Sequence, residues 1–187
     1  ATTVKRNIRR GIENVSLYEL GHVYLWDSNA PAIPALPGGV RPTDEQLAAL
    51  DAGLPDQPNH VAGILTGLAE DDGWLGGKRP VDWSDAVEAV HRLADRIGAK
   101  IVLDQPAAED VPAQWHPGRA ARVMVGDVFT GWVGELHPRV NEALGFPAHS
   151  AAFELNLTAL FGTLTGKPVQ AKPISSFPPV KQDLAFT

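Results

Sequence analysis

The sequence has no cysteine, a single methionine and no excess of positive charge. Without cysteine, disulfide frameworks, cysteine-based zinc sites and thiol catalysis are all excluded. No apolar run approaches membrane-spanning length and nothing at the start resembles a signal peptide, so we expect no membrane contact and a cytoplasmic location. The net charge of −6 provides no general basic field for phosphates, which argues against a primary RNA- or DNA-binding domain.

What the chain does contain is typical of one folded domain. Hydrophobic residues make up 44% and charged residues 20% of its 187 positions, which is enough apolar content for a sizeable core. The sequence starts without a methionine and stops at DLAFT, inside a run typical of a strand. We therefore expect it to be a piece of a longer polypeptide.

Helix signals begin at residues 2–10, where arginines suit the C-terminal end of a helix and a glycine follows as a stop. The longest apolar repeat at three- and four-residue spacing runs through 82–98, with Asp82 or Ser84 as the N-cap. Shorter helices or helical turns are expected at 43–50, 138–145 and 158–164.

Strand signals complete the pattern. Residues 15–26 carry apolar side chains on both faces, which predicts an interior strand. Residues 27–59 are rich in proline and glycine and predict a surface excursion, with Thr43 and Gln46 at capping-box spacing. Further strands are expected at 60–69, 100–105, 151–157 and 181–186. This order favours an α+β domain, a mainly antiparallel sheet flanked by helices.

The most patterned segment runs from Trp115 to Pro138, with the sequence WHPGRAARVMVGDVFTGWVGELHP. Two His-Pro pairs bracket two strand-like runs that meet at Gly126-Asp127, which predicts a hairpin. The segment also holds the best candidates for chemistry, namely His116, Arg119, Glu135 and His137.

Two interpretations of these four side chains stay open. In the first, His116 and Arg119 bind a phosphate or carboxylate, or all four form an acid/base, hydrolytic or other small-ligand site. Glu135 and His137 are two apart on one strand, so they would face the same way and share an ion. In the second, the Pro-Gly pair after His116 makes a turn, Arg119 pairs with an acid and His137 caps the next helix. We favour the second, because Pro-Gly is first of all turn chemistry.

Other motifs are weaker. The segments GGVRPT (38–43) and GWLGGKRP (73–80) contain glycines and a cation but match neither phosphate-loop pattern. The histidines form no metal-binding spacing and no serine lies in a nucleophile elbow, so we expect no metal and no catalytic residue. The dispersed tryptophans predict core or hairpin packing rather than a base-stacking platform: Trp26, Trp74, Trp83, Trp115 and Trp132.

A set of motifs in fixed order carries a resemblance. They are NIRRG at 7–11, LYELGHVYL at 17–25, VDWSDAVEAV at 81–90, WHPGRAARV at 115–123, VGELHPRV at 133–140, FELNLTAL at 153–160 and SSFPPVKQDLAF at 175–186. The ordered set resembles the core domain of the bacterial phenylalanine–tRNA ligase β subunit and covers most of the chain. Residues 27–57 contain nothing diagnostic of that family.

The resemblance implies a class II aminoacyl-tRNA synthetase-like core over residues 1–170. In that family the β-subunit core is a degenerate copy of the catalytic domain. Residues 17–25 are similar to the second strand of the motif 2 hairpin, with Glu19 retained, and the glycine-rich motif 3 has no counterpart. Residues 171–187 resemble a linker and the first strand of a truncated ferredoxin-like anticodon-binding domain.

The resemblance also implies a function. It predicts a non-catalytic scaffold that supports the α subunit's active site in an α2β2 heterotetramer, with ATP and Mg²⁺ used by the holoenzyme and no cofactor in this piece. Contact with tRNA is expected mainly through other domains. A direct tRNA contact through Arg119, Arg122 and Arg139 is the third hypothesis, which the net charge disfavours. One departure is that many relatives have a Lys-Gly pair near the start of the long helix, which residues 82–88 lack.

Overall fold

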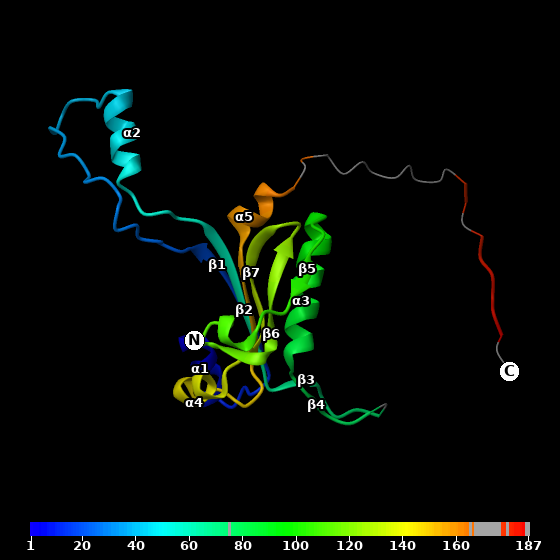
Figure 1. Cartoon of the computed structure of the whole chain (residues 1–187). Helices are drawn as coiled ribbons and strands as arrows, with labels where there is room; N and C mark the ends of the chain where they lie inside the picture. The colour runs from blue at the N-terminus through cyan, green and yellow to red at the C-terminus, as the bar shows by residue number, and fades with distance from the viewer. Residues whose placement is uncertain (75, 165, 167–176, 179, 186–187) are drawn as a thin grey trace.

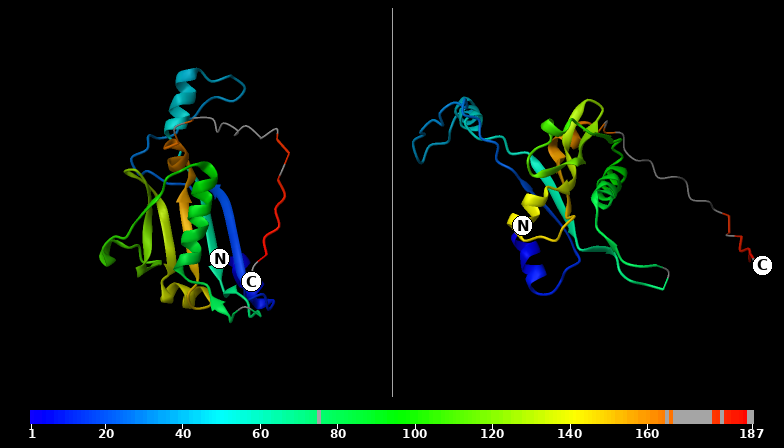
Figure 2. Two further views of the ribbon diagram at one scale, coloured as in Figure 1. Left: turned by 90° about the vertical axis from the view of Figure 1, so that its right-hand side faces the viewer. Right: turned by 60° about the horizontal axis from the view of Figure 1, so that its bottom comes forward.

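A six-stranded antiparallel sheet forms the centre of the molecule, in the order β1-β2-β8-β7-β6-β5 (Figure 1). The computed structural model describes residues 1–74, 76–164, 166, 177–178 and 180–185. In sheet order, the strands are β1 (Val15–His22), β2 (Asn59–Thr66), β8 (Ala151–Asn156), β7 (Val128–Leu136), β6 (Trp115–Val125) and β5 (Val102–Asp104). The long helix α3 (Trp83–Ile97) packs along one face of this sheet (Figure 2). The predicted α+β class is confirmed.

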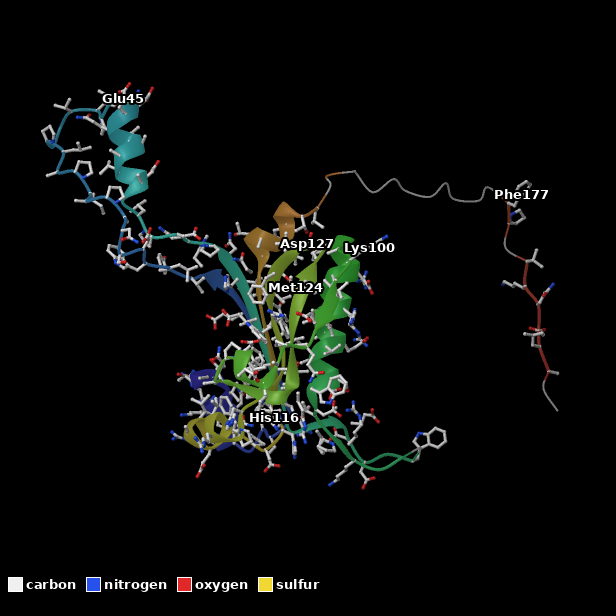
Figure 3. All side chains as sticks on the ribbon, in the orientation of Figure 1. Glu45, Lys100, His116, Met124, Asp127 and Phe177 are labelled. Carbon is white, nitrogen blue, oxygen red and sulfur yellow. The ribbon has the colours of Figure 1, made fainter. Side chains whose placement is uncertain are left out.

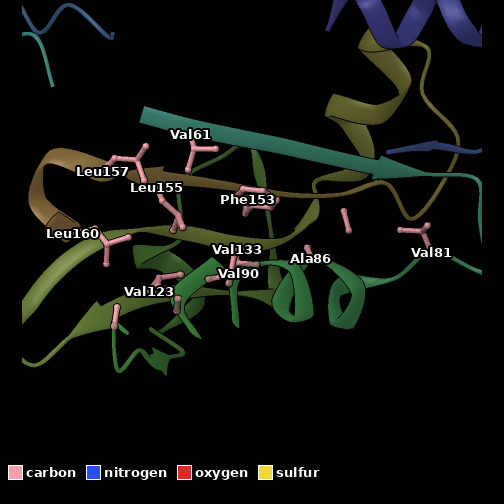
Figure 4. Close-up of a cluster of buried hydrophobic side chains, with 13 residues drawn as sticks. Val61, Val81, Ala86, Val90, Val123, Val133, Phe153, Leu155, Leu157 and Leu160 are labelled. Atoms are coloured by element: carbon pink, nitrogen blue, oxygen red, sulfur yellow. The ribbon is translucent and has the colours of Figure 1, made fainter. Parts of the chain in front are cut away.

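The main core lies between α3 and the sheet (Figure 4). Val90 and Ala94 come from the apolar side of α3, and both are almost fully buried. They belong to one cluster with Val123, Val133 and Leu155, which come from the three strands β6, β7 and β8. The three- and four-residue apolar spacing that predicted the helix is therefore the spacing that places its side chains on the sheet.

The N-terminal end of α3 is fixed by hydrogen bonds that its sequence supplies. Asp82 accepts a bond from the Ser84 N–H at 2.7 Å, and its own N–H donates to the Asp85 carboxylate at 2.9 Å, so Asp82 is the N-cap. Arg79 donates to both Asp85 oxygens, at 3.0 and 2.7 Å, and to Glu70 at 2.9 Å. The bond from Arg79 lowers the pKa of Asp85 from its ordinary value, and the same pairing raises the pKa of Arg79.

Shorter helices cover the two ends of the sheet. The helices α1 (Thr2–Arg9) and α4 (Pro138–Leu144) lie together at one end, and α5 (Leu157–Gly162) lies at the other (Figure 1). A second, smaller core lies at the end of the sheet that α1 and α4 cover. It is formed by Val4, Val15 and Phe146. All three helices fall where the sequence predicted them.

Strand β1 corrects two expectations, because it lies at the edge of the sheet rather than in its interior. Its one sheet neighbour in the described part of the chain is β2, which follows it, so residues 17–25 are not the second strand of a hairpin. Tyr18 and Leu20, whose apolar character suggested burial, are 75% and 61% exposed. Apolar residues on both faces do not distinguish an interior strand from an edge strand with an uncovered face.

Residues 23–58 leave the sheet as an arm (Figure 1), which confirms the predicted surface excursion. Leu25 and Asp56 exchange two backbone hydrogen bonds, at 2.8 and 3.1 Å, and so join the two legs of the arm. The helix α2 (Asp44–Ala52) lies farther out, and Thr43 and Gln46 form the predicted capping box at its start.

A small hairpin that the sequence did not predict follows β2. The strand expected at 60–69 stops at Thr66, and the chain then forms β3 (Leu68–Glu70) and β4 (Arg79–Pro80). The glycine-rich segment 73–80 makes the outer part of this hairpin, where Gly73 and Gly76 bind each other through their backbones. Those amides are therefore used within the hairpin itself. A turn of 3₁₀ helix, Ala108–Asp110, lies between β5 and β6.

The tryptophans divide between core and surface. Trp115 is buried, and Trp132 is half-buried with its ring 6.0 Å from that of Phe129, as expected of core and hairpin packing. The same expectation is wrong for three others, Trp26, Trp74 and Trp83, which are 74%, 93% and 47% exposed. They lie on the arm, on the small hairpin and at the start of α3, and none of the three belongs to the main core cluster.

The C-terminal segment lies partly outside the described residues. Where the structure does describe it, residues 180–185 form no strand, although one was expected at 181–186. A strand needs a neighbour for its backbone hydrogen bonds, and none of the described strands lies beside this segment. The division of the chain at residue 170 stays a prediction. Of the helices in the described part of the chain, none has the length and apolar character needed to cross a bilayer.

Candidate functional site

The candidate residues gather around a bulge at the start of β6. Trp115 pairs with Leu136 and Ala120 pairs with Gly134, so the four residues 116–119 lie opposite a single residue of β7. A proline within this segment has no N–H to donate to the sheet, which favours a local departure from the ladder. The HPGR sequence therefore stands out from the strand, at the end of the sheet away from the arm (Figure 3, His116).

The bulge forms the turn that the sequence favoured. The Nδ1 atom of His116 accepts a hydrogen bond from the Gly118 N–H at 3.1 Å, which closes the segment on itself. Opposite the bulge, β7 has Gly134, where an added Cβ would lie 2.2 Å from the Arg119 carbonyl oxygen and 2.5 Å from the Ala120 Cα. Glycine is thus required for the two backbones to come this close.

Glu135 is the residue of β7 that lies opposite the bulge. Its side chain is only 5% exposed, and its carboxylate accepts a bond from the Arg119 guanidinium at 2.8 Å. This pairing confirms the expectation that Arg119 binds a nearby acid. A buried carboxylate needs such a partner, because desolvation of an unpaired charge costs several kcal/mol.

His149 is a second neighbour of Glu135 that the sequence did not reveal. Its Nδ1 lies 3.5 Å from the Glu135 carboxylate, at the limit of a hydrogen bond. Its φ of +61° makes it the one non-glycine residue with left-handed backbone in the described part of the chain. Residues outside glycine rarely adopt this conformation, so the loop around His149 is held there by its surroundings.

These side chains border a hollow of about 530 Å³ between the bulge, β7, α4 and the loop of His149. His116, Arg119 and Glu135 line it, together with His149 and Asn141. Asn141 is 5% exposed, and its Oδ1 has no hydrogen-bond partner among the described residues. The sequence offered no signal for Asn141 or His149, because nothing in their spacing links them to β6.

His137 does not join this group. Its Nδ1 accepts a hydrogen bond from the Arg139 N–H at 3.1 Å, so the ring caps α4 as the second interpretation predicted. The expectation that all four candidate side chains converge is therefore wrong, because capping turns His137 to the helix. It is equally wrong that Glu135 and His137 share an ion, and no group of three or more metal-ligating side chains exists within the described residues.

The arginines suggested for RNA contact are mostly engaged within the fold. Arg119 binds Glu135, and Arg122 binds the Asp104 carboxylate through two nitrogens, at 2.9 and 2.5 Å. Arg139 is exposed at the start of α4. Asp82 and Asp85, which begin the segment 82–88, supply the cap of α3.

Comparison with known proteins gives a consistent answer. Residues 1–157 match the family described as the phenylalanyl tRNA synthetase beta chain CLM domain. The chain is 92% identical over its whole length to the phenylalanine–tRNA ligase beta subunit of Bifidobacterium longum, and spans 22% of that protein. It is 44% identical over 97% of its length to the same subunit of Mycolicibacterium paratuberculosis, and 42% identical over 98% to that of Streptomyces avermitilis, and spans 21% and 22% of these.

The chain thus spans about a fifth of the length of these relatives. The match includes the bulge, Glu135, α4 and the arm, since all of them lie within residues 1–157. The chain therefore belongs to the family of phenylalanyl-tRNA synthetase beta chain CLM domains.

Proposed function

We propose that this chain is the non-catalytic core of a phenylalanine–tRNA ligase β subunit, with the fold of a class II synthetase core. It supports the α subunit, which holds the active site and uses ATP and Mg²⁺, within an α2β2 heterotetramer in the cytoplasm. The tRNA is bound mainly by other domains, and the ligase joins phenylalanine to it. The observation that carries this proposal is the family match over residues 1–157.

The geometry of the candidate residues supports the non-catalytic role. General acid–base catalysis needs a titratable group within reach of a substrate. Here Glu135 is paired with Arg119, His116 accepts from its own turn, and His137 caps α4. Each side chain has a bond that the fold itself needs.

The ligase assembled from full-length α and β subunits tests the proposal. His116→Asn and His137→Asn remove the imidazoles but keep a side-chain acceptor for the same backbone N–H groups. We expect kcat for aminoacylation to stay within about twofold of the wild type, because neither ring takes part in chemistry. A loss of about a hundredfold or more with the complex intact would contradict the proposal, since general acid–base groups contribute at that level. Failure of wild-type β to copurify with α would contradict the supporting role.

A second candidate is the small-ligand alternative, in its narrower form of an anion site at His116 and Arg119. We propose it because both residues line the same hollow and the Arg119 side chain is 44% exposed, which leaves part of the guanidinium facing water beside Glu135. Titration with inorganic phosphate, followed through the His116 ring signals in NMR spectra, tests it. The proposal requires a saturable shift of these ring signals; a linear or absent response rejects it.

A further inference from the structure

The arm formed by residues 23–58 is an ordered element rather than a loose loop. Besides the bridge between Leu25 and Asp56, the Val23 N–H donates to the Pro58 carbonyl oxygen at 3.1 Å. The arm also folds on itself farther out, where an added Cβ on Gly53 would lie 2.7 Å from Ile33. The N-terminal end of the helix α2 is stabilised by its capping box. The backbone of the arm is thus held in place by its own contacts.

The arm nevertheless leaves its large apolar side chains in water. Those more than 45% exposed are Tyr24, Leu25, Trp26, Ile33, Val40 and Leu54. Within the described chain, α2 buries none of its nine residues, and the arm extends away from the sheet (Figures 1 and 3, Glu45). An exposed apolar surface of this extent on an ordered element is typical of a contact with another macromolecule.

The net charge of the arm indicates which kind of macromolecule would contact it. The arm contains five carboxylates, from Asp27, Asp44, Glu45, Asp51 and Asp56, against the single cation of Arg41, a net charge of −4. Phosphates are repelled by such a surface, so RNA is disfavoured. Exposed tyrosine and tryptophan are enriched at protein interfaces, and the surrounding carboxylates select a partner rimmed by lysine and arginine.

We propose that the arm docks on a basic surface of the α subunit, with Tyr24 and Trp26 entering an apolar recess there. This inference rests on the proposed function, which supplies the α subunit as the partner. It adds the segment that makes the contact and the chemistry of the surface that receives it. Charge complementarity also makes the contact sensitive to salt, because exposed charges are screened at high ionic strength.

The full-length β and α subunits test the docking through the dissociation constant of their complex. Tyr24→Ser with Trp26→Ser removes the aromatic anchors without touching the main core. We expect the dissociation constant to rise about tenfold or more, as is typical for loss of aromatic anchors. Asp51→Lys with Asp56→Lys reverses two charges and so changes the net charge of the arm by four units, at positions away from the start of α2. Here we expect a rise at low salt that disappears at high salt.

The matched control is Trp74→Ser, because Trp74 is also an exposed tryptophan but lies on the small hairpin. It should leave the dissociation constant unchanged, and an equal rise would reject a specific role for the arm. Arm variants that bind α like the wild type would overturn the inference while leaving the proposed function intact. Arm variants that weaken only tRNA binding would also overturn the inference, because RNA would then be the occupant. Arm variants that weaken only the self-association of β would overturn it too, because a second copy of β would then be the occupant. Wild-type β that fails to bind α would instead remove the proposed function, and this inference with it.

Discussion

The sheet with α3 and the arm of residues 23–58 are stabilised in opposite ways. Leu155 of the sheet and Val90 of α3 are essentially inaccessible and belong to the core that holds these two layers together. In the arm, hydrogen bonds between the legs and a helix cap fix the backbone, while Trp26 and Tyr24 stay 74% and 69% exposed. Both regions contain ordered secondary structure. The comparison shows that in this chain apolar content alone does not say which residues form the core, because the same residue types are also exposed on the arm.

The largest expected effect is a difference in the free energy of unfolding between two leucine-to-alanine variants, one in the sheet and one in the arm. Leu155→Ala removes a fully buried side chain and should lower the free energy of unfolding by about 2–5 kcal/mol. Leu47→Ala removes the same atoms from α2, where the side chain is 41% exposed, and should change it by less than about 0.5 kcal/mol. Denaturant unfolding of both variants measures the two values. Similar losses would mean that the arm belongs to the cooperative core.

A smaller effect, dependent on pH, concerns Asp85. Its pKa is lower in the folded chain because Arg79 binds its carboxylate, so protonation favours the unfolded chain. The stabilisation is complete above the unfolded pKa of about 3.9 and is lost as the pH falls through the folded value. Asp85→Asn keeps an oxygen for the cap but loses the charge. It should cost about 1 kcal/mol at neutral pH.

Unfolding curves at pH 7 and near pH 3 check the Asp85 prediction. The wild type loses this stabilisation in acid and the variant does not, so the difference between them should narrow there. Glu70→Gln, at the more exposed partner of the same guanidinium, should have the smaller effect. A difference for Asp85→Asn that stays constant with pH would show that its ion pair with Arg79 does not stabilise the fold.

The smallest global effect is expected for the cap of α2. Thr43→Ala removes the hydroxyl that accepts from the Gln46 N–H and should destabilise the local helix by about 1 kcal/mol. Because α2 has no part in the main core, the midpoint of global unfolding should not move. Hydrogen exchange should speed up for amides of α2 but not for those of β8. Faster exchange in both would show that the arm and the sheet unfold together.

Local chemistry explains which elements the sequence predicted well. The capping boxes at Thr43 and Asp82, the turn at Gly126-Asp127 and the cap at His137 all depend on residues within a few positions of one another. The apolar repeat of α3 is equally local, because the helix period sets it. Each of these features could be predicted from residues that are close together in the sequence.

The elements that the sequence missed depend on residues far apart in the chain. The edge position of β1 follows from which strand pairs with it, and its own residues do not encode that choice. The contact between Glu135 and His149 arises because the chain returns past β7 after α4. The sequence HPGR at 116–119 indicated a turn, but the position of Glu135 opposite that bulge depends on the register of β6 and β7.

The position of β8 has a consequence for how the chain acquires its structure. This strand is the last of the sheet in the sequence but lies between β2 and β7, so it joins the β1–β2 pair to the β5–β6–β7 group. During synthesis, the β1–β2 pair and the β5–β6–β7 group therefore keep unpaired edges until residues 151–156 leave the ribosome. Such long-range closure is slow and exposes pairing edges to neighbouring chains. A ribosome-bound chain that stops before β8 therefore leaves the pairing edges of β2 and β7 open.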